Sequence, residues 1–153
     1  MLENKIIVEV NDLTNSDFEN SLFFDIVEST IEKSGIECLK RKKISISLAL
    51  VAPEEMQKLN SQCRNKNEVT DVLSFSEFGA DDLCQNKEEE IYLGEIVICP
   101  SYIEKSSVLQ NVTFEYELAY IVSHGVLHLL GFLHSEKMFS LQEDAVKKVL
   151  NKK

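Results

Sequence analysis

Apolar and polar positions along the chain follow two different periods, which predicts a protein with both strands and helices. Alternation or a short apolar run, typical of strands, occurs in four segments, residues 6–10, 44–51, 70–75 and 91–98. Apolar positions at helical spacing occur in five segments, residues 17–35, 53–62, 100–108, 113–131 and 139–150. The resulting order β-α-β-α-β-β-α-α-α predicts an α+β fold, a single domain over residues 1–153 with a small mixed four-stranded sheet covered by helices.

The segment 113–131 is apolar on nearly every side of the predicted helix. Its apolar residues include Ala119, Ile121, Val122, Val126, Leu127, Leu129 and Leu130. A helix that is hydrophobic all round is normally buried, so we expect a central helix inside the domain. Thr113 is a suitable N-cap, and Glu115 and Glu117 follow it near the positive end of the helix dipole.

The only histidines of the chain are His124 and His128 in this segment and His134 just after it. His124 and His128 are four residues apart and therefore project from one face of a helix. Gly131 can adopt the left-handed conformation that ends a helix and turns the chain back, which would bring His134 to the other two. Three converging imidazoles with an open fourth position are typical of a catalytic zinc site, so we expect these three residues to bind a metal.

The histidine spacing matches the zinc-protease string H-E-x-x-H-x-x-G-x-x-H with one difference. Gly125 stands where that string has the glutamate that acts as the base. The site therefore has the ligands of a metallohydrolase without the usual protease base. Phosphodiester cleavage would need positive charge beside the phosphoryl group, and Arg64 and Lys66 are candidates if residues 60–75 fold over the site.

Two carboxylates are candidates for supporting roles. Glu117 lies seven residues before His124 and could orient a ligand histidine through its other ring nitrogen, although a surface glutamate favoured by the helix dipole is an equal alternative. Asp71 could hold a turn or brace Arg64, or it could simply begin a strand.

The charge distribution is uneven and bears on any nucleic-acid function. The formal net charge is −10, whereas general RNA-binding proteins are usually basic. Much of the acid falls in residues 77–90, which we interpret as an acidic loop with too few apolar residues to pack. The basic block at residues 40–43 is interpreted as a solvated surface.

The sequence indicates a cytoplasmic protein, which bears on the state of its cysteines. Cys38, Cys63, Cys84 and Cys99 are scattered and form no C-x-x-C pair, so we expect reduced thiols without a disulfide, with Cys99 in the core. We recognise no signal peptide and no apolar run long enough to span a membrane.

Three motifs resemble the YbeY family of bacterial single-domain metallo-endoribonucleases. The residues from His124 to His134 are similar to the family's H-G-x-L-H-L-x-G-x-D-H signature. Leu59, Asn60, Arg64 and the segment 70–75 are similar to its L-N-x-x-x-R and T-D-V-L-S-F-P motifs, and residues 93–96 to its L-G-D-I motif. Leu133, Ser76 and Glu95 depart from the family pattern, which has aspartate, proline and aspartate at these positions.

The resemblance implies one zinc ion (Zn²⁺) per chain, held by His124, His128 and His134, and a functional Arg64 near the metal. It implies cleavage of single-stranded RNA, with roles in 3′-end maturation of small-subunit (16S) ribosomal RNA and in ribosome quality control. It also implies contacts with the small ribosomal subunit and its assembly factors, and no membrane. A positively lined cleft leading to the metal would reconcile RNA binding with the net charge.

Two alternatives stay open at this stage. The protein could be a non-catalytic, zinc-stabilised ribosome assembly factor, or a metallohydrolase with a peptide or small-molecule substrate. Within the nuclease hypothesis, either activated water or a neighbouring 2′-hydroxyl could attack the phosphate, and the two routes leave different product ends.

Overall fold

The computed structural model describes residues 6–16, 18–79 and 82–151, which form a layer of helices on a four-stranded sheet. The strands are β1 (Ile6–Asp12), β2 (Lys43–Leu50), β3 (Val72–Ser76) and β4 (Glu90–Ile98). Their order is β1-β2-β4-β3. Strands β1, β2 and β4 are parallel, and β3 runs antiparallel to β4 at the edge. The predicted mixed sheet in a single α+β domain is confirmed.

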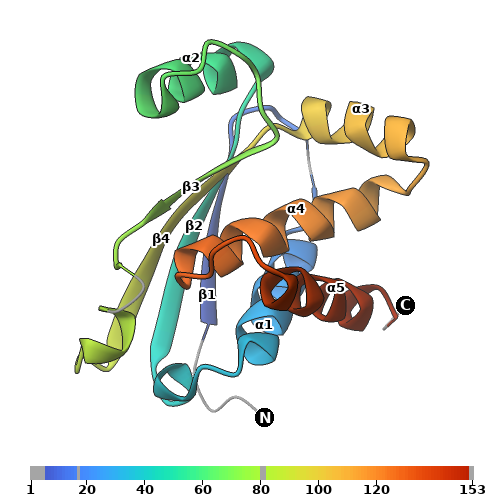
Figure 1. The fold of residues 1–153 in the computed structure, drawn as a ribbon. Coiled ribbons are helices and arrows are strands. Elements are labelled where there is room, and N and C mark those ends of the chain that lie inside the picture. Colours follow the sequence, from blue (N-terminus) through green and yellow to red (C-terminus); the bar gives the residue numbers. More distant parts are fainter. Residues whose placement is uncertain (1–5, 17, 80–81, 152–153) are drawn as a thin grey trace.

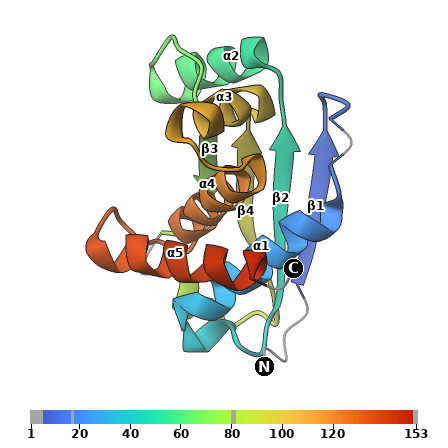
Figure 2. The same ribbon diagram turned by 90° about the vertical axis from the view of Figure 1, so that its right-hand side faces the viewer.

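Five α-helices accompany the sheet in the part of the chain described. They are α1 (Asn20–Ser34), α2 (Pro53–Arg64), α3 (Pro100–Gln110), α4 (Phe114–Leu129) and α5 (Glu136–Leu150). Helices α1, α4 and α5 cover one face of the sheet, and α2 and α3 lie beyond one of its ends (Figures 1 and 2). The order of elements is as predicted, although the expected first residue of α1, Asp17, lies outside the described residues.

Alternation along the strands separates the two faces of the sheet. Ile44, Ile46, Leu48 and Leu50 of β2 are buried in the main core, which also contains residues of α1, α4 and α5. A smaller second cluster lies where α2 adjoins the sheet, and it consists of Ala49, Val51, Met56, Leu73, Val97 and Cys99. Cys99 is therefore in the core, as expected.

A bulge in β4 determines which residues of this strand face the helices. Three residues of β2 from Ser45 to Ser47 oppose four of β4 from Tyr92 to Glu95. The extra residue makes Leu93 and Ile96 both face the helices. Gly94 has φ +138°, and a Cβ there would lie 2.2 Å from the Phe75 carbonyl oxygen, so glycine is required.

Helix α4 is the central buried helix that the sequence predicts. It packs against α1, α3 and α5 and against strands β3 and β4. The Thr113 hydroxyl accepts a hydrogen bond from the Tyr116 N–H at 3.1 Å, which confirms the predicted N-cap. Among the described residues, no helix combines the length and the apolar character needed to cross a membrane.

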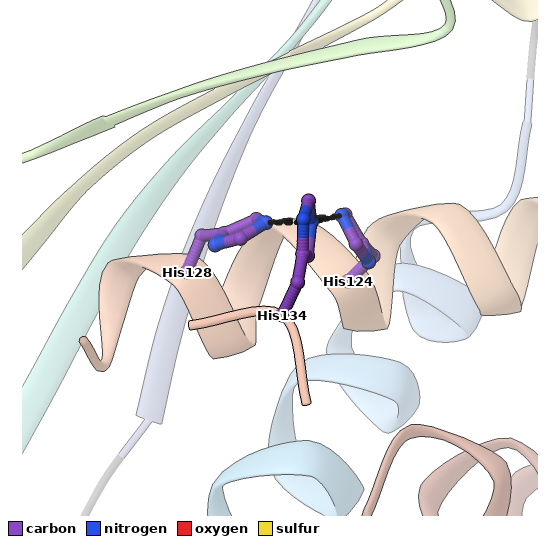
Figure 3. Close-up of side chains that lie close together, drawn as sticks. All are labelled: His124, His128 and His134. Atoms are coloured by element: carbon purple, nitrogen blue, oxygen red, sulfur yellow. Dashed lines mark hydrogen bonds between the residues drawn. The ribbon is translucent and has the colours of Figure 1, made fainter. Parts of the chain in front are cut away.

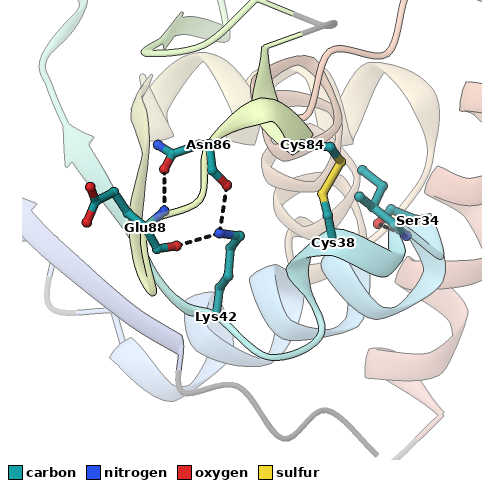
Figure 4. The surroundings of a disulfide bond; sticks show 7 residues. Ser34, Cys38, Lys42, Cys84, Asn86 and Glu88 are labelled. Carbon is teal, nitrogen blue, oxygen red and sulfur yellow. Dashed lines mark hydrogen bonds between the residues drawn. A yellow bond between two sulfur atoms is a disulfide. The ribbon is translucent and has the colours of Figure 1, made fainter.

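The cysteine prediction is wrong for one pair, because Cys38 and Cys84 form a disulfide (Figure 4). The two residues are 46 positions apart in the sequence, so no local spacing pattern indicates that they pair. Each lies in a short 3₁₀ helix, Glu37–Leu39 or Leu83–Gln85, shortly before a strand. Because those strands, β2 and β4, are parallel neighbours, the chain segments that precede them meet at the same end of the sheet.

The acidic segment 77–90 is attached to the body more firmly than predicted, although residues 80–81 lie outside the description. Its Leu83 is buried in the main core. The basic block at residues 40–43 lies beside it, and the Lys42 ammonium donates hydrogen bonds to the carbonyls of Asn86 and Glu88 (Figure 4). Lys43 and Glu90 form an exposed ion pair. The basic block therefore binds the acidic segment in addition to facing solvent.

Candidate metal centre

The three histidines converge because a helix and the turn after it present them to the same point (Figure 3). His124 and His128 project one turn apart from α4. Gly131 has φ +93°, and the Phe132 N–H donates to the Leu127 carbonyl at 3.0 Å, so the chain reverses directly after the helix. This reversal carries His134 back beside the other two side chains.

The Nε2 atoms of the three imidazoles form a small triangle. The distances are 3.0 Å between His124 and His128, 3.1 Å between His128 and His134, and 3.3 Å between His134 and His124. Nitrogens bound at about 2.0–2.1 Å to one tetrahedral zinc ion lie roughly 3.3–3.4 Å apart. The triangle has nearly that size, so one ion fits all three nitrogens at once.

The protonation of the rings also suits a cation. The Nδ1 of His128 lies 3.1 Å from the Phe132 carbonyl, which can only accept, so Nδ1 carries the proton and the Nε2 lone pair faces the triangle. Burial lowers the pKa of His124 and of His128, and neighbouring histidines lower it further. Neutral imidazoles with inward lone pairs are the form that binds a metal.

Gly125 allows α4 to lie close to the sheet behind the ligands. A Cβ at this position would approach three side-chain atoms of Ile96 at 3.1–3.3 Å. The glutamate that zinc proteases carry here would have to enter this contact. The absence of the protease base therefore has a packing reason as well as a chemical consequence.

A cleft of about 620 Å³ opens from the histidines toward the segment that joins α2 and β3. Its walls include His124, His128 and His134 on one side and Arg64 and Lys66 on the other. Residues 60–75 thus fold over the site as the sequence hypothesis required. Among the described residues that line the cleft, none comes from the acidic segment 77–90.

Arg64 is the last residue of α2, and its guanidinium is held at the edge of the cleft. Nη2 donates to the Ser74 carbonyl at 2.8 Å, and Nη1 donates to the Cys63 carbonyl at 3.3 Å. The guanidinium carbon lies 5.2 Å from the centre of the Phe75 ring, within cation–π range. These contacts fix the direction of the side chain, although the residue is exposed.

The cleft is less basic than the sequence analysis expected. Glu68 and Asp71 line it together with Arg64 and Lys66, so the formal charges of these four side chains balance. Burial raises the pKa of the Asp71 carboxyl, and hydrogen bonds to Val72 and Thr70 partly oppose this. Asp71 bonds to Thr70 while Arg64 bonds to backbone carbonyls. The additional positive charge in this cleft would have to come from a bound metal ion.

Glu117 neither orients a ligand histidine nor lies at the surface, which were the two alternatives from the sequence. It is only 2% exposed. Its carboxylate accepts hydrogen bonds from the Ser106 hydroxyl at 2.6 Å and from the Gln110 amide at 2.9 Å. The residue therefore joins α4 to α3 and directs its carboxylate to that helix instead of to a histidine.

Sequence reasoning missed Gln142 of α5, whose side-chain Nε2 donates to the Tyr120 carbonyl at 2.8 Å, one helical turn before His124. The residue is 0% exposed, on the side of α5 that also buries Met138, Ala145 and Val149. A polar residue within an apolar stripe at helical spacing was the signal that could have identified it.

Comparisons with known proteins agree with this geometry. The family model described as Endoribonuclease YbeY matches residues 9–150. The chain is 34% identical over 128 residues to Endoribonuclease YbeY of Bdellovibrio bacteriovorus, covering 74% of this chain and 79% of that one. It is 36% identical over 126 residues to the Endoribonuclease YbeY of Thermotoga maritima, covering 76% and 77%.

A solution structure of a Thermotoga maritima protein has the same fold. It superposes with a TM-score of 0.63 at 29% sequence identity, covering 97% of this chain and 90% of the other. The family model spans nearly the whole chain, including all three histidines and Arg64. From this match and the triad of imidazoles, the chain belongs to the YbeY family of endoribonucleases, which are metal-dependent RNA hydrolases.

Proposed function

We propose that this protein is a zinc-dependent endoribonuclease specific for single-stranded RNA. We further propose that it matures the 3′ end of small-subunit (16S) ribosomal RNA and acts in ribosome quality control. The observation that carries the proposal is the placement of three converging imidazoles and a fixed, exposed arginine in the lining of one cleft. Phosphodiester cleavage requires both a Lewis acid and a charge-stabilising donor in such an arrangement.

His124, His128 and His134 would hold the zinc ion and leave its fourth position facing the cleft. When bound, zinc supplies a Lewis acid and makes water a stronger nucleophile near neutral pH. Three nitrogen ligands favour zinc over magnesium and calcium, which prefer oxygen ligands.

Arg64 would stabilise the negative charge that develops on the phosphoryl oxygens. Two guanidinium nitrogens donate to backbone carbonyls, and the remaining N–H groups of the fork are available to a phosphate. Lys66, which is exposed on the same side of the cleft, would bind a neighbouring phosphate of the strand. Asp71 would act as a polar neighbour of the reacting phosphate.

Single-stranded RNA is the substrate class that fits this site. A phosphodiester must reach nitrogen atoms beside a buried helix, and a splayed strand can enter where a duplex cannot. The ribosomal substrate, the small ribosomal subunit and assembly factors as partners, and a cytoplasmic location are proposed from the family resemblance.

The test is to purify the wild type, His128→Ala, Arg64→Ala and a matched control, Arg41→Ala. Arg41 is an exposed arginine in the basic block, outside the cleft lining. Bound zinc and cleavage of a single-stranded RNA are measured for each. We expect His128→Ala to lose zinc and cleavage, Arg64→Ala to keep zinc but lose about 100-fold in rate, and Arg41→Ala to resemble the wild type.

A wild-type protein that binds zinc but neither cleaves RNA nor restores 3′-end maturation in cells lacking it would overturn the proposal. Cleavage that persists equally in His128→Ala and Arg64→Ala would assign the activity to a contaminating nuclease. Analysis of the product ends distinguishes attack by water from attack by the 2′-hydroxyl.

A further inference from the structure

We infer that Gln142 of α5 is a positioning residue for the metal centre: its side-chain oxygen fixes the orientation and the tautomer of His124. The inference rests on the zinc site proposed above and deepens it. Its readouts do not require RNA cleavage, so it can fail independently of the nuclease proposal.

The amide of Gln142 has only one plausible orientation. Its Nε2 donates to the Tyr120 carbonyl at 2.8 Å. A carbonyl oxygen can only accept, so the nitrogen must face Tyr120 and Oε1 must occupy the other end of the amide. Tyr120 lies one turn before His124 on α4, so this anchor holds the amide beside the histidine.

The oxygen end of the amide is buried and lacks a fully formed hydrogen bond. Gln142 is 0% exposed, and its Oε1 is the buried side-chain atom among the described residues that has no partner within standard hydrogen-bond geometry. The anchor at Tyr120 puts this oxygen one helical turn from His124, whose pKa the Gln142 side chain raises, so the His124 imidazole is the donor that we infer for it. A buried acceptor without a partner is suited to a ring donor that strengthens when the ring binds a metal.

The His124 nitrogen available for this contact is Nδ1. Its Nε2 lies 3.0 Å and 3.3 Å from the Nε2 atoms of His128 and His134. An acceptor at Nδ1 selects the tautomer with Nδ1–H and leaves the Nε2 lone pair for the metal. Coordination at Nε2 would polarise the ring and make Nδ1–H a stronger donor, which would close the contact with Oε1.

The neighbouring ligand shows the same arrangement with a different acceptor. The Nδ1 of His128 lies 3.1 Å from the Phe132 carbonyl, which the reversal at Gly131 places there. His128 is thus oriented by backbone in its own turn, and His124 by a side chain from another helix. Metal binding and the packing of α5 on α4 are therefore coupled through one amide.

The test compares the wild type with Gln142→Met, Gln142→Glu and Ser29→Ala. Methionine preserves the approximate volume and removes the acceptor, whereas glutamate retains an acceptor for Nδ1. Ser29 is the matched control, because its buried hydroxyl donates to the Ala145 carbonyl of α5 at 2.9 Å and is not part of the histidine cluster. Zinc affinity is measured by competition with a chelator, and thermal unfolding reports on stability.

We expect zinc affinity to fall about 10–100-fold in Gln142→Met and to be restored in Gln142→Glu, because outer partners of metal-bound histidines typically have effects of this size. Ser29→Ala should lose stability and keep wild-type affinity. A fall of similar size in Ser29→Ala, or no recovery in Gln142→Glu, would mean that Gln142 acts only through packing and would overturn the inference.

A second readout uses the metal-free wild type and does not depend on any variant folding. Nitrogen-15 NMR of the imidazoles should show the proton of His124 on Nδ1. In Gln142→Met this preference should be lost at His124 and kept at His128, whose acceptor is a backbone carbonyl. A wild-type His124 with its proton on Nε2 would overturn the inference.

Discussion

The two sides of the cleft are built differently. The ligand wall, consisting of α4 and the turn at residues 130–135, has two of its three histidines partly buried and rests on the core through Gly125 and Ile96. The arginine wall, consisting of residues 60–76, is exposed from residue 61 to residue 68. This exposed part is held by polar contacts, such as the Asn60 amide donating to the Glu68 carbonyl at 3.0 Å, whereas β3 is held by its pairing with β4.

The difference indicates a division of roles. A metal requires ligands fixed within a fraction of an ångström, which a buried helix provides. An RNA strand requires a charged donor that it can reach from solvent, which an exposed helix end provides. Substitutions should therefore change folding and metal binding in the ligand wall, and rate in the arginine wall.

The largest effect on stability is expected for Gly125→Glu in the ligand wall. The new side chain must enter the contact with Ile96, so we expect a loss of more than about 3 kcal/mol in the free energy of unfolding, measured by urea denaturation. Gly125→Ala is the graded control and should stay within about 1 kcal/mol, because its gain in helix propensity offsets the tighter contact. Wild-type stability in Gly125→Glu would show that Gly125 does not set the helix–sheet distance.

The next effect is expected for Arg64→Lys in the arginine wall. Lysine keeps the positive charge but lacks the planar guanidinium. In Arg64 that group bonds the Ser74 carbonyl and has further N–H groups free for a phosphate. We expect single-turnover cleavage to slow about 100-fold, with zinc affinity unchanged and stability within about 0.5 kcal/mol. A loss of zinc in this variant would contradict the separation of the two walls.

The pH dependence of the metal-free protein should follow the ligand wall. The pKa values of His124 and His128 are lowered in the folded state, so the unfolded chain binds more protons below its own histidine pKa of about 6.5. Their contribution to stability is therefore complete above about pH 6.5 and declines as the pH falls toward the lowered values. As the pH is lowered through this range, the urea midpoint should fall less in a variant with both histidines replaced by glutamine than in the wild type. An equal fall in the two proteins would be evidence against the prediction.

The smallest effect is expected for Leu133→Asp, which restores the residue that the family pattern has before the last histidine. The Leu133 side chain is 80% exposed and is not part of the cleft lining, so stability should change by less than about 0.5 kcal/mol. We expect cleavage to rise by less than about tenfold, since a nearby carboxylate can assist proton transfer. An unchanged rate would show that Leu133 does not reduce the rate of cleavage in this protein.

The same contrast explains what the sequence could predict. The histidine triangle depends on a four-residue helical spacing and one glycine, which are local features, and the predicted order of elements follows from local periodicity. The start of α5 at Glu136 was placed too late, because the cap at Ser135 precedes the apolar stripe. Local signals therefore located the ligand wall well and its boundaries less well.

Features that depend on distant pairs were not predictable in this way. The Cys38–Cys84 bond follows from the pairing of β2 with β4, which no short-range pattern encodes. Burial of Leu83 and the hydrogen bond from Gln142 to the Tyr120 carbonyl depend likewise on packing between separate elements. The bulge at Gly94 could not be read from an apolar run that fits a regular strand equally well.

The disulfide has a consequence for the connectivity of the molecule. The 46-residue separation between Cys38 and Cys84 encloses the arginine wall in a covalent ring, whereas all three ligand histidines lie outside it. A protease that cuts the exposed residues 61–68 would produce two fragments still joined through the sulfur atoms. On a gel, such a nicked protein would run as one chain until a reductant separates the fragments.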